Sequence, residues 1–202
     1  MPTMKILPSC VFAALLGLLP GCATIDDLSS ETYRRVSFSS NVFDREVVGL
    51  LPMSGTPGVQ DYVSQADLIF QGHLRRLWEG RPHIEARESL QRIRKAGLER
   101  VYQDWAKSLA SGRPPEQDPP AQIGKAIGAR YLLQPELQRI ELAEGATQVR
   151  LVGRIWDAEK GDLLWEGLGE SRGYVMLIFP WVPSSFEKTM AVASKGLIRR
   201  MP

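Results

Sequence analysis

The chain contains few of the side chains that usually carry enzymatic or metal chemistry. Its 202 residues include two cysteines, Cys10 and Cys22, and two histidines, His73 and His83. Two cysteines cannot build a disulfide framework or a cysteine-rich zinc or iron–sulfur site, and two histidines cannot build a histidine-rich metal centre. The sequence contains neither a glycine-rich phosphate loop nor a nucleophile elbow. We therefore expect a protein that is not an enzyme and that binds no metal and no cofactor.

The composition is that of a folded protein with little net charge. Hydrophobic residues make up 44% of the chain and charged residues 24%, which is close to the average for globular proteins. The length is enough for one domain. Twenty-five basic and 23 acidic residues leave a formal net charge of +2. So small a basic excess gives no reason to expect a nucleic-acid partner.

Residues 1–21 have the features of a signal peptide for export. Lys5 precedes an apolar stretch over residues 11–19, which is shorter than the roughly 20 apolar residues needed to span a bilayer. The stretch ends in Leu19-Pro20-Gly21-Cys22, which resembles the lipobox of bacterial lipoproteins. The alternative is an ordinary cleaved signal peptide with an incidental cysteine.

The lipobox resemblance implies how the chain is processed and where it resides. The signal would be cut between Gly21 and Cys22, a diacylglyceryl group would be attached to the Cys22 thiol, and the new amino group would receive an acyl chain such as palmitate. Cys10 would leave with the signal, so the mature chain would have no free thiol. Ala23 takes the place where an aspartate commonly means retention in the inner membrane. The resemblance therefore implies a protein anchored in the cell outer membrane and facing the periplasm.

The mature chain divides into a tether, residues 22–42, and one domain, residues 43–202. The tether is rich in Ser, Thr and Asp and is expected to be flexible. Strand patterns occur at 45–52, 81–85, 130–141, 149–156 and 162–167, and helical spacing of apolar residues occurs at 59–78, 90–109 and 121–128. A last helix is predicted to begin at Ser184, with Glu187 completing a capping box. This order predicts an α/β (α+β) fold: a single mixed sheet of about five strands flanked by helices.

Three segments together resemble a superfamily of bacterial envelope lipoproteins. They are residues 47–52, 127–133 and 155–167, and the last has the pattern strand, aspartate, turn, glycine, strand with tryptophan. Their order is similar to that in the periplasmic domain of the curli-secretion-channel lipoprotein (CsgG), in the lipoprotein activators of penicillin-binding proteins and in the N-terminal domain of TolB. The resemblance implies this α/β fold and a function by binding, with another envelope protein as the partner.

The pattern in residues 155–167 also has a purely structural explanation. Asp157 can accept hydrogen bonds in the turn, Gly161 can adopt a positive φ, and Trp165 can pack across the hairpin. The alternative is that Trp156 or Trp165 stacks on a sugar.

Residues 173–183 form the most unusual segment of the domain. They are almost continuously apolar, whereas a strand of a membrane barrel should alternate, and this argues against a pore. The segment is either a buried strand, a loop that contacts a protein partner, or a loop that contacts lipid. The candidate interaction residues are Tyr174, Phe179 and Trp181, because large exposed apolar groups mark contact sites.

The remaining polar features have structural explanations that we weigh against functional ones. His73 and His83 are expected to be surface or hydrogen-bonded side chains. Glu136 and Glu141 could in principle support glycosidase chemistry, but their place beside Arg139 suggests surface pairing. The basic residues between positions 92 and 100 are expected to form the solvent-exposed side of a helix, with contact to anionic lipid or glycan as the alternative.

The sequence thus predicts a lipid-anchored outer-membrane lipoprotein that acts as a non-enzymatic binding or assembly component of the cell envelope. The alternative is an oligomeric secretion-channel subunit of the curli type, which would form a homo-oligomer. A third possibility, an envelope hydrolase, would require a deep pocket lined by His73 or His83 together with a carboxylate.

Overall fold

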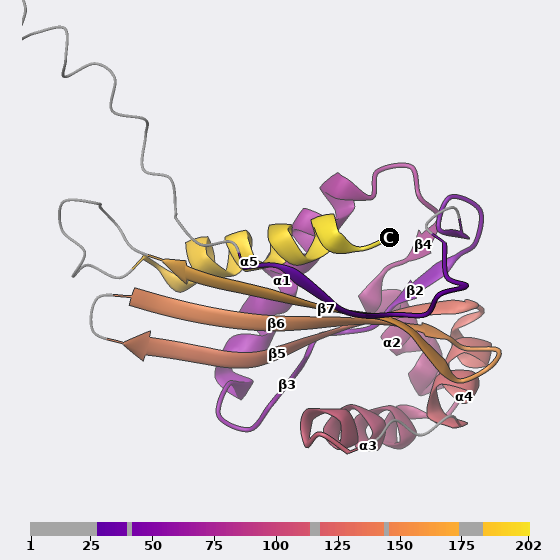
Figure 1. Ribbon diagram of the computed structural model, residues 1–202. Coiled ribbons are helices and arrows are strands. Elements are labelled where there is room, and N and C mark those ends of the chain that lie inside the picture. Colours follow the sequence, from indigo (N-terminus) through magenta and orange to yellow (C-terminus); the bar gives the residue numbers. More distant parts are fainter. Residues whose placement is uncertain (1–27, 40–41, 114–117, 144–145, 174–183) are drawn as a thin grey trace, which may run out of the picture.

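The computed structural model describes residues 28–39, 42–113, 118–143, 146–173 and 184–202, and these residues form one mixed sheet with helices on both faces (Figure 1). The strands are β1 (Ser30–Arg34), β2 (Val48–Leu50), β3 (Ser54–Gly55), β4 (His83–Ile84), β5 (Tyr131–Ala143), β6 (Ala146–Asp157) and β7 (Asp162–Gly173). Their order across the sheet is β1-β7-β6-β5-β2-β4, and β3 pairs with β5 beyond the end of β2. The predicted α/β fold with one mixed sheet is confirmed.

The helices divide between the two faces of the sheet. The helices α1 (Gln60–Leu77) and α5 (Phe186–Arg200) cover one face, and α2 (Ala86–Lys95), α3 (Glu99–Ala110) and α4 (Asp118–Ile127) lie on the other (Figure 1). Strand alternation supplies both cores, because Ile155 on β6 packs with the α1–α5 layer and Trp156 packs with the α2–α4 layer. All buried members of the two clusters come from residues 38–201. Within the described part of the chain, residues 38–201 therefore supply both layers of the core.

The β6–β7 hairpin forms as its turn chemistry predicts. Asp157 Oδ1 accepts a hydrogen bond from Glu159 N at 3.0 Å, and Gly161 has φ 69°. Trp165 and Trp156 are fully buried, on opposite faces of the sheet. A side chain with no exposed surface cannot stack on a sugar, so the structural explanation of these tryptophans is confirmed.

The segment from Leu28 to residue 42 differs from the tether that the sequence predicts. Strand β1 pairs antiparallel with β7, and Trp165 Nε1 donates to Glu31 Oε2 at 2.8 Å. Phe38 is buried with Phe43 in the α1–α5 core. The folded domain thus begins well before residue 43. The sequence does not reveal β1 because every side chain of this edge strand is exposed, so no apolar alternation marks it.

The apolar pattern over residues 90–109 was expected to be one helix, and the structure divides it into α2 and α3. Gly97, with φ 71°, ends α2: its N–H donates to Arg94 O, and Leu98 N donates to Ile93 O, both at 3.0 Å. These two bonds form a Schellman motif, which stops a helix at a left-handed glycine. Gly112, with φ 70°, ends α3 as predicted.

The last helix begins one residue later than expected. Ser185, rather than Ser184, is the N-cap, and its Oγ accepts from Lys188 N at 3.4 Å. The side chain of Ser184 is buried instead, and its backbone bonds to neighbouring strands.

Candidate functional site

The residues that the sequence singles out for processing and interaction lie outside the described residues. These are Gly21 and Cys22 at the predicted cleavage and lipidation site, and Tyr174, Phe179 and Trp181 in the apolar segment. The described residues nevertheless locate the points at which both segments join the domain.

These points meet at one end of the sheet, which we call the proximal end. Ser184 N donates to Gly173 O at 3.0 Å, so the two residues that flank positions 174–183 are hydrogen-bonded to each other. Thr147 on β6 pairs with Gly173 and donates from its hydroxyl to Ser184 O at 2.7 Å. Leu28 N donates to Glu170 O at 3.0 Å, so the N-terminal segment enters at the same end.

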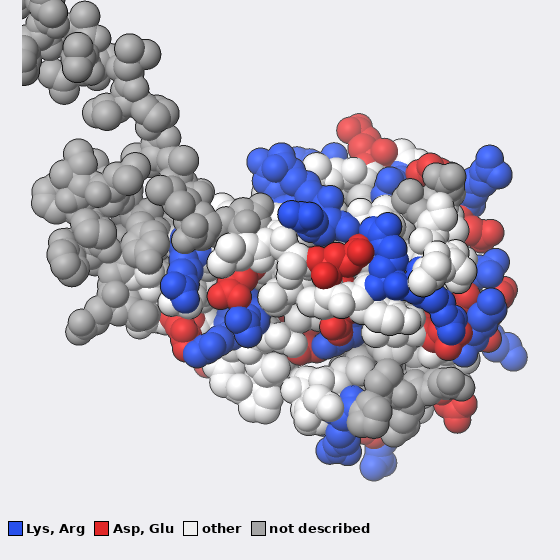
Figure 2. All heavy atoms as spheres, in the orientation of Figure 1, with Lys and Arg blue, Asp and Glu red and all other residues white. Residues whose placement is uncertain are grey.

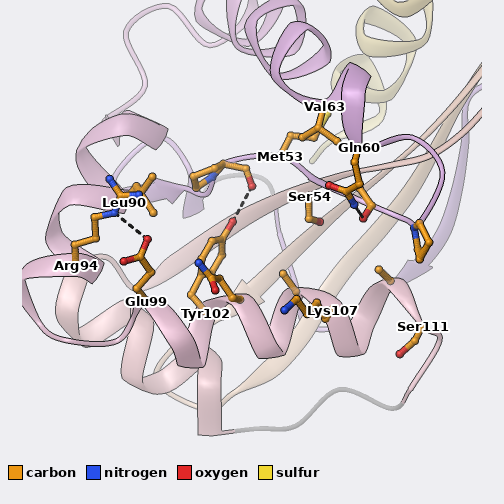
Figure 3. Close-up of a pocket in the computed structure, with 16 residues that line it drawn as sticks. Met53, Ser54, Gln60, Val63, Leu90, Arg94, Glu99, Tyr102, Lys107 and Ser111 are labelled. Atoms are coloured by element: carbon orange, nitrogen blue, oxygen red, sulfur yellow. Dashed lines mark hydrogen bonds and ion pairs between the residues drawn. The ribbon is translucent and has the colours of Figure 1, made fainter.

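A groove runs between α3 and the wall formed by β3 and the start of α1 (Figure 3). Its volume is about 810 Å³. Figure 3 shows Tyr102 and Lys107 on α3, with Ser111 just after its end, across from Ser54, Gln60 and Val63 on the opposite wall. Since β3 runs parallel to β5, the end of the groove at Pro57 points the same way as the proximal end.

The backbone along the β3 wall of the groove already has hydrogen-bond partners. Tyr102 Oη donates to Pro52 O at 2.8 Å, and Gln60 Nε2 donates to Gly55 O at 2.7 Å. Met53 N donates to Asp67 Oδ1 at 3.3 Å, and Thr56 N donates to Leu137 O at 3.1 Å. The wall that remains is mainly apolar.

Burial raises the pKa of two side chains behind this wall, Asp67 and Tyr102. Desolvation raises the pKa of Asp67, although hydrogen bonds from Gln71 and from Met53 N act in the opposite direction. Desolvation, with a smaller contribution from Asp67, also raises the pKa of the Tyr102 phenol. Tyr102 is thus neutral and acts as a hydrogen-bond donor that ties α3 to the sheet.

Charged side chains sit on the α3 rim of the groove. Arg94 Nε lies 3.0 Å from Glu99 Oε1, so these two charges compensate each other at the start of α3. Lys107, two turns further along the helix, is exposed and has no ion-pair partner among the described residues. One end of the groove is therefore electrically neutral, and the middle carries a positive charge.

A row of polar side chains crosses the sheet next to this groove. Arg154 bridges Glu136 and Glu166, with nitrogen–oxygen distances of 2.6 and 2.7 Å. The hydroxyl of Thr32 on β1 donates to Glu166 Oε1 at 3.1 Å. Ser54, which lines the groove, is the register partner of Glu136 on β5. Glu136 was expected to be a surface residue, and the structure instead buries it against Arg154; Glu141 does pair with Arg139, as predicted.

The two histidines lie on different elements and away from the groove. His73 lies on α1, where its Nδ1 is 3.4 Å from Arg76, and burial, Arg76 and Lys195 lower its pKa. His83 lies on β4, where its Nδ1 is 2.8 Å from Arg81 O and its Nε2 is 3.6 Å from Glu85 Oε1. Neither side chain lines the groove. Within the described ranges, no cluster of three or more His, Cys, Asp and Glu residues could hold a metal ion.

The basic residues at positions 92–100 divide between α2 and α3, and three of the four pair with a carboxylate, Lys95 being the exception among the described residues. Arg92 donates to Ile127 O at the end of α4 and pairs with Glu88, while Arg100 lies 3.7 Å from Asp104. Lys/Arg and Asp/Glu side chains alternate over the face seen in Figure 2 rather than gathering by sign.

In the part of the chain that the structure describes, no helix has the length and apolar character needed to cross a bilayer.

Sequence reasoning did not identify the groove. The helical spacing of Tyr102 and Ala106 predicts ordinary core positions, and nothing in the sequence distinguishes Lys107 from other exposed lysines. The only signal was the cluster of Pro52, Gly55 and Pro57, which keeps the chain near α3 in an extended or turn conformation and without regular helix.

Comparisons with known proteins find partial likenesses among solved structures. No family model matches the chain, and no curated protein matches it. The PelC dodecamer from Paraburkholderia phytofirmans is 14% identical, with a TM-score of 0.45, and the match covers 84% of this chain and 96% of that one. Lipoprotein GNA1162 from Neisseria meningitidis is 15% identical, with a TM-score of 0.40 and coverage of 64% and 82%.

The C-terminal domain of LpoB from Escherichia coli gives a similar result. It is 14% identical, with a TM-score of 0.42, and the match covers 62% of this chain and 81% of that domain. At these identities and TM-scores, the likeness gives no information about the function of this chain.

Proposed function

We propose that the chain is a lipid-anchored outer-membrane lipoprotein that faces the periplasm and acts by binding another envelope protein. The observation that carries the proposal is the meeting of Leu28, Gly173 and Ser184 at the proximal end of the sheet. An acyl group on Cys22 would lie six residues before Leu28, which is at most about 20 Å of extended chain. The proximal end would then face the bilayer.

This orientation would place the apolar segment 174–183 beside the membrane surface, because both of its flanking residues belong to the proximal end. Tyr174, Phe179 and Trp181 would meet a partner that is itself in or close to the membrane. A binding role also agrees with the sequence resemblance to the envelope lipoprotein superfamily, and with histidines that lie apart from the groove.

Lipidation is tested by mass spectrometry of the protein purified from the bacterial envelope. We expect Cys22→Ser to abolish the diacylglyceryl and N-acyl modifications and to leave the leader uncleaved or cut elsewhere. The matched control is Cys10→Ser, which should be modified like the wild type because position 10 lies within the leader. An unmodified Cys22 in the wild-type protein would refute the anchor.

Binding is tested by photo-crosslinking in cells from position 179 or 181. A crosslinker at position 125 on α4 serves as the control. Lys125 lines a hollow together with Ala158 in the β6–β7 turn, and Gly173 is at the opposite end of β7. We expect a discrete protein adduct from 181 that Phe179→Glu removes while the circular dichroism spectrum is unchanged. Retention of the adduct in that folded variant would remove the segment from the binding site. Light scattering in detergent tests the alternative, because a stable ring would instead indicate a secretion-channel subunit.

A further inference from the structure

The groove beside α3 is large enough to hold a small-molecule ligand. The α3 rim from Glu99 to Ser111 is about 18 Å long, at 1.5 Å per residue. The volume of the groove, about 810 Å³, falls in the range of small-molecule sites. Along this length the groove is lined by the apolar side chains of Met53, Val63, Leu90, Ala106 and Ala110.

The wall of the groove favours a hydrocarbon chain over a peptide. A bound peptide must find partners for its own backbone N–H and C=O groups. Four backbone atoms along the β3 wall are already hydrogen-bonded within the protein, namely Pro52 O, Met53 N, Gly55 O and Thr56 N. Pro52 and Pro57 have no N–H to offer. An alkyl chain has no such groups, so it would leave no backbone donor or acceptor of its own unpaired against this surface.

The charges on the rim select the head group. Lys107 is the unpaired cation beside the groove within the described residues, whereas Arg94 is neutralised by Glu99 at 3.0 Å. An anionic head group would therefore be attracted to Lys107, and its tail would extend past Tyr102 toward Leu90. We propose that this groove binds a fatty acid, with the carboxylate at Lys107 and the alkyl chain between α3 and β3. The proposal does not depend on the lipid anchor.

The test is calorimetric titration of residues 23–202, which include every described residue of the two core clusters. The probes are sodium dodecanoate below its micelle concentration and, as a charge-reversed probe of the same tail, dodecyltrimethylammonium. We expect saturable one-to-one binding of dodecanoate. Lys107→Glu should weaken it about tenfold, because an attraction is replaced by a repulsion, and should strengthen binding of the cation.

Two further variants separate the groove from other surfaces. Ala110→Trp should block both probes by filling the groove, and Lys125→Glu, which makes the same charge change on α4 outside the groove, should bind dodecanoate like the wild type. The proposal is overturned if wild-type protein shows no saturable binding, or if the folded variants Lys107→Glu and Ala110→Trp bind dodecanoate as well as the Lys125→Glu control. Because the protein used carries no acyl group, either result leaves the lipidation test at Cys22 to be decided separately.

Discussion

Arg154 Nη1 lies 2.6 Å from Glu136 Oε2, and this contact compensates a carboxylate whose side chain is only 1% exposed. Arg154 itself is 10% exposed and makes a second contact to Glu166, which is 29% exposed. Taking charges out of water is costly unless each has a partner with good geometry. The centre of the sheet therefore depends on one arginine that serves two carboxylates on neighbouring strands.

Arg154→Met should destabilise the domain by about 3–5 kcal/mol, because it leaves Glu136 as a buried, uncompensated charge. Urea unfolding at neutral pH measures the change. The double variant Glu136→Gln, Arg154→Met should recover much of the loss, since the buried charge is gone. A single variant as stable as the wild type would show that Glu136 finds other compensation.

Gly169→Ala should destabilise the packing of α5 on β7. A Cβ atom at this position would lie 2.5 Å from Ala193 O and 2.8 Å from Leu197 Cβ, so the helix would have to move. Overpacking of this kind costs about 1–3 kcal/mol. The control is Gly72→Ala on α1, where a Cβ meets nothing within 4 Å and should stabilise the helix by about 0.5–1 kcal/mol. Equal effects of the two variants in thermal unfolding would contradict the close packing.

Asp67→Asn should flatten the dependence of stability on pH. Burial raises the folded-state pKa of Asp67 above its unfolded value. The group therefore contributes stability below the unfolded pKa, and this contribution is lost as pH rises through the folded pKa. Asparagine keeps an oxygen to accept from Met53 N but cannot ionise. We expect the Tm of the variant, relative to that of the wild type, to increase as the pH is raised from acidic to neutral. Parallel Tm profiles of the two proteins would exclude the effect.

Ser185→Ala should cost about 1 kcal/mol of folding free energy, because the N-cap hydroxyl that accepts from Lys188 N is lost. Ser184→Ala is the matched comparison. It removes the neighbouring hydroxyl but preserves the backbone bonds of Ser184 to Gly173 and Thr147. Chemical denaturation of both variants measures the loss of folding free energy. A larger loss for Ser184→Ala than for Ser185→Ala would contradict the assignment of Ser185 as the N-cap.

Local patterns in the sequence were sufficient for the elements that are amphipathic over their full length. The stripe through Ala66, Phe70 and Leu74 predicts α1, and Asp157 with Gly161 predicts the β6–β7 hairpin. Both depend on contacts between residues that are close in the chain. The division of the second helical stripe at Gly97 was missed, because the apolar spacing continues across the break and only the capping bonds reveal it.

The sequence by itself predicted the α/β fold with one mixed sheet, which the structure confirms, and a lipoprotein leader, which stays a prediction. Only the tertiary structure decided that β1 joins the sheet at β7, that Glu136 is buried against Arg154, and that a groove forms between α3 and β3. These features bring together residues that are distant in the chain. Edge strands, buried ion pairs and grooves depend on which elements pack side by side, and neither periodicity nor turn chemistry encodes that choice.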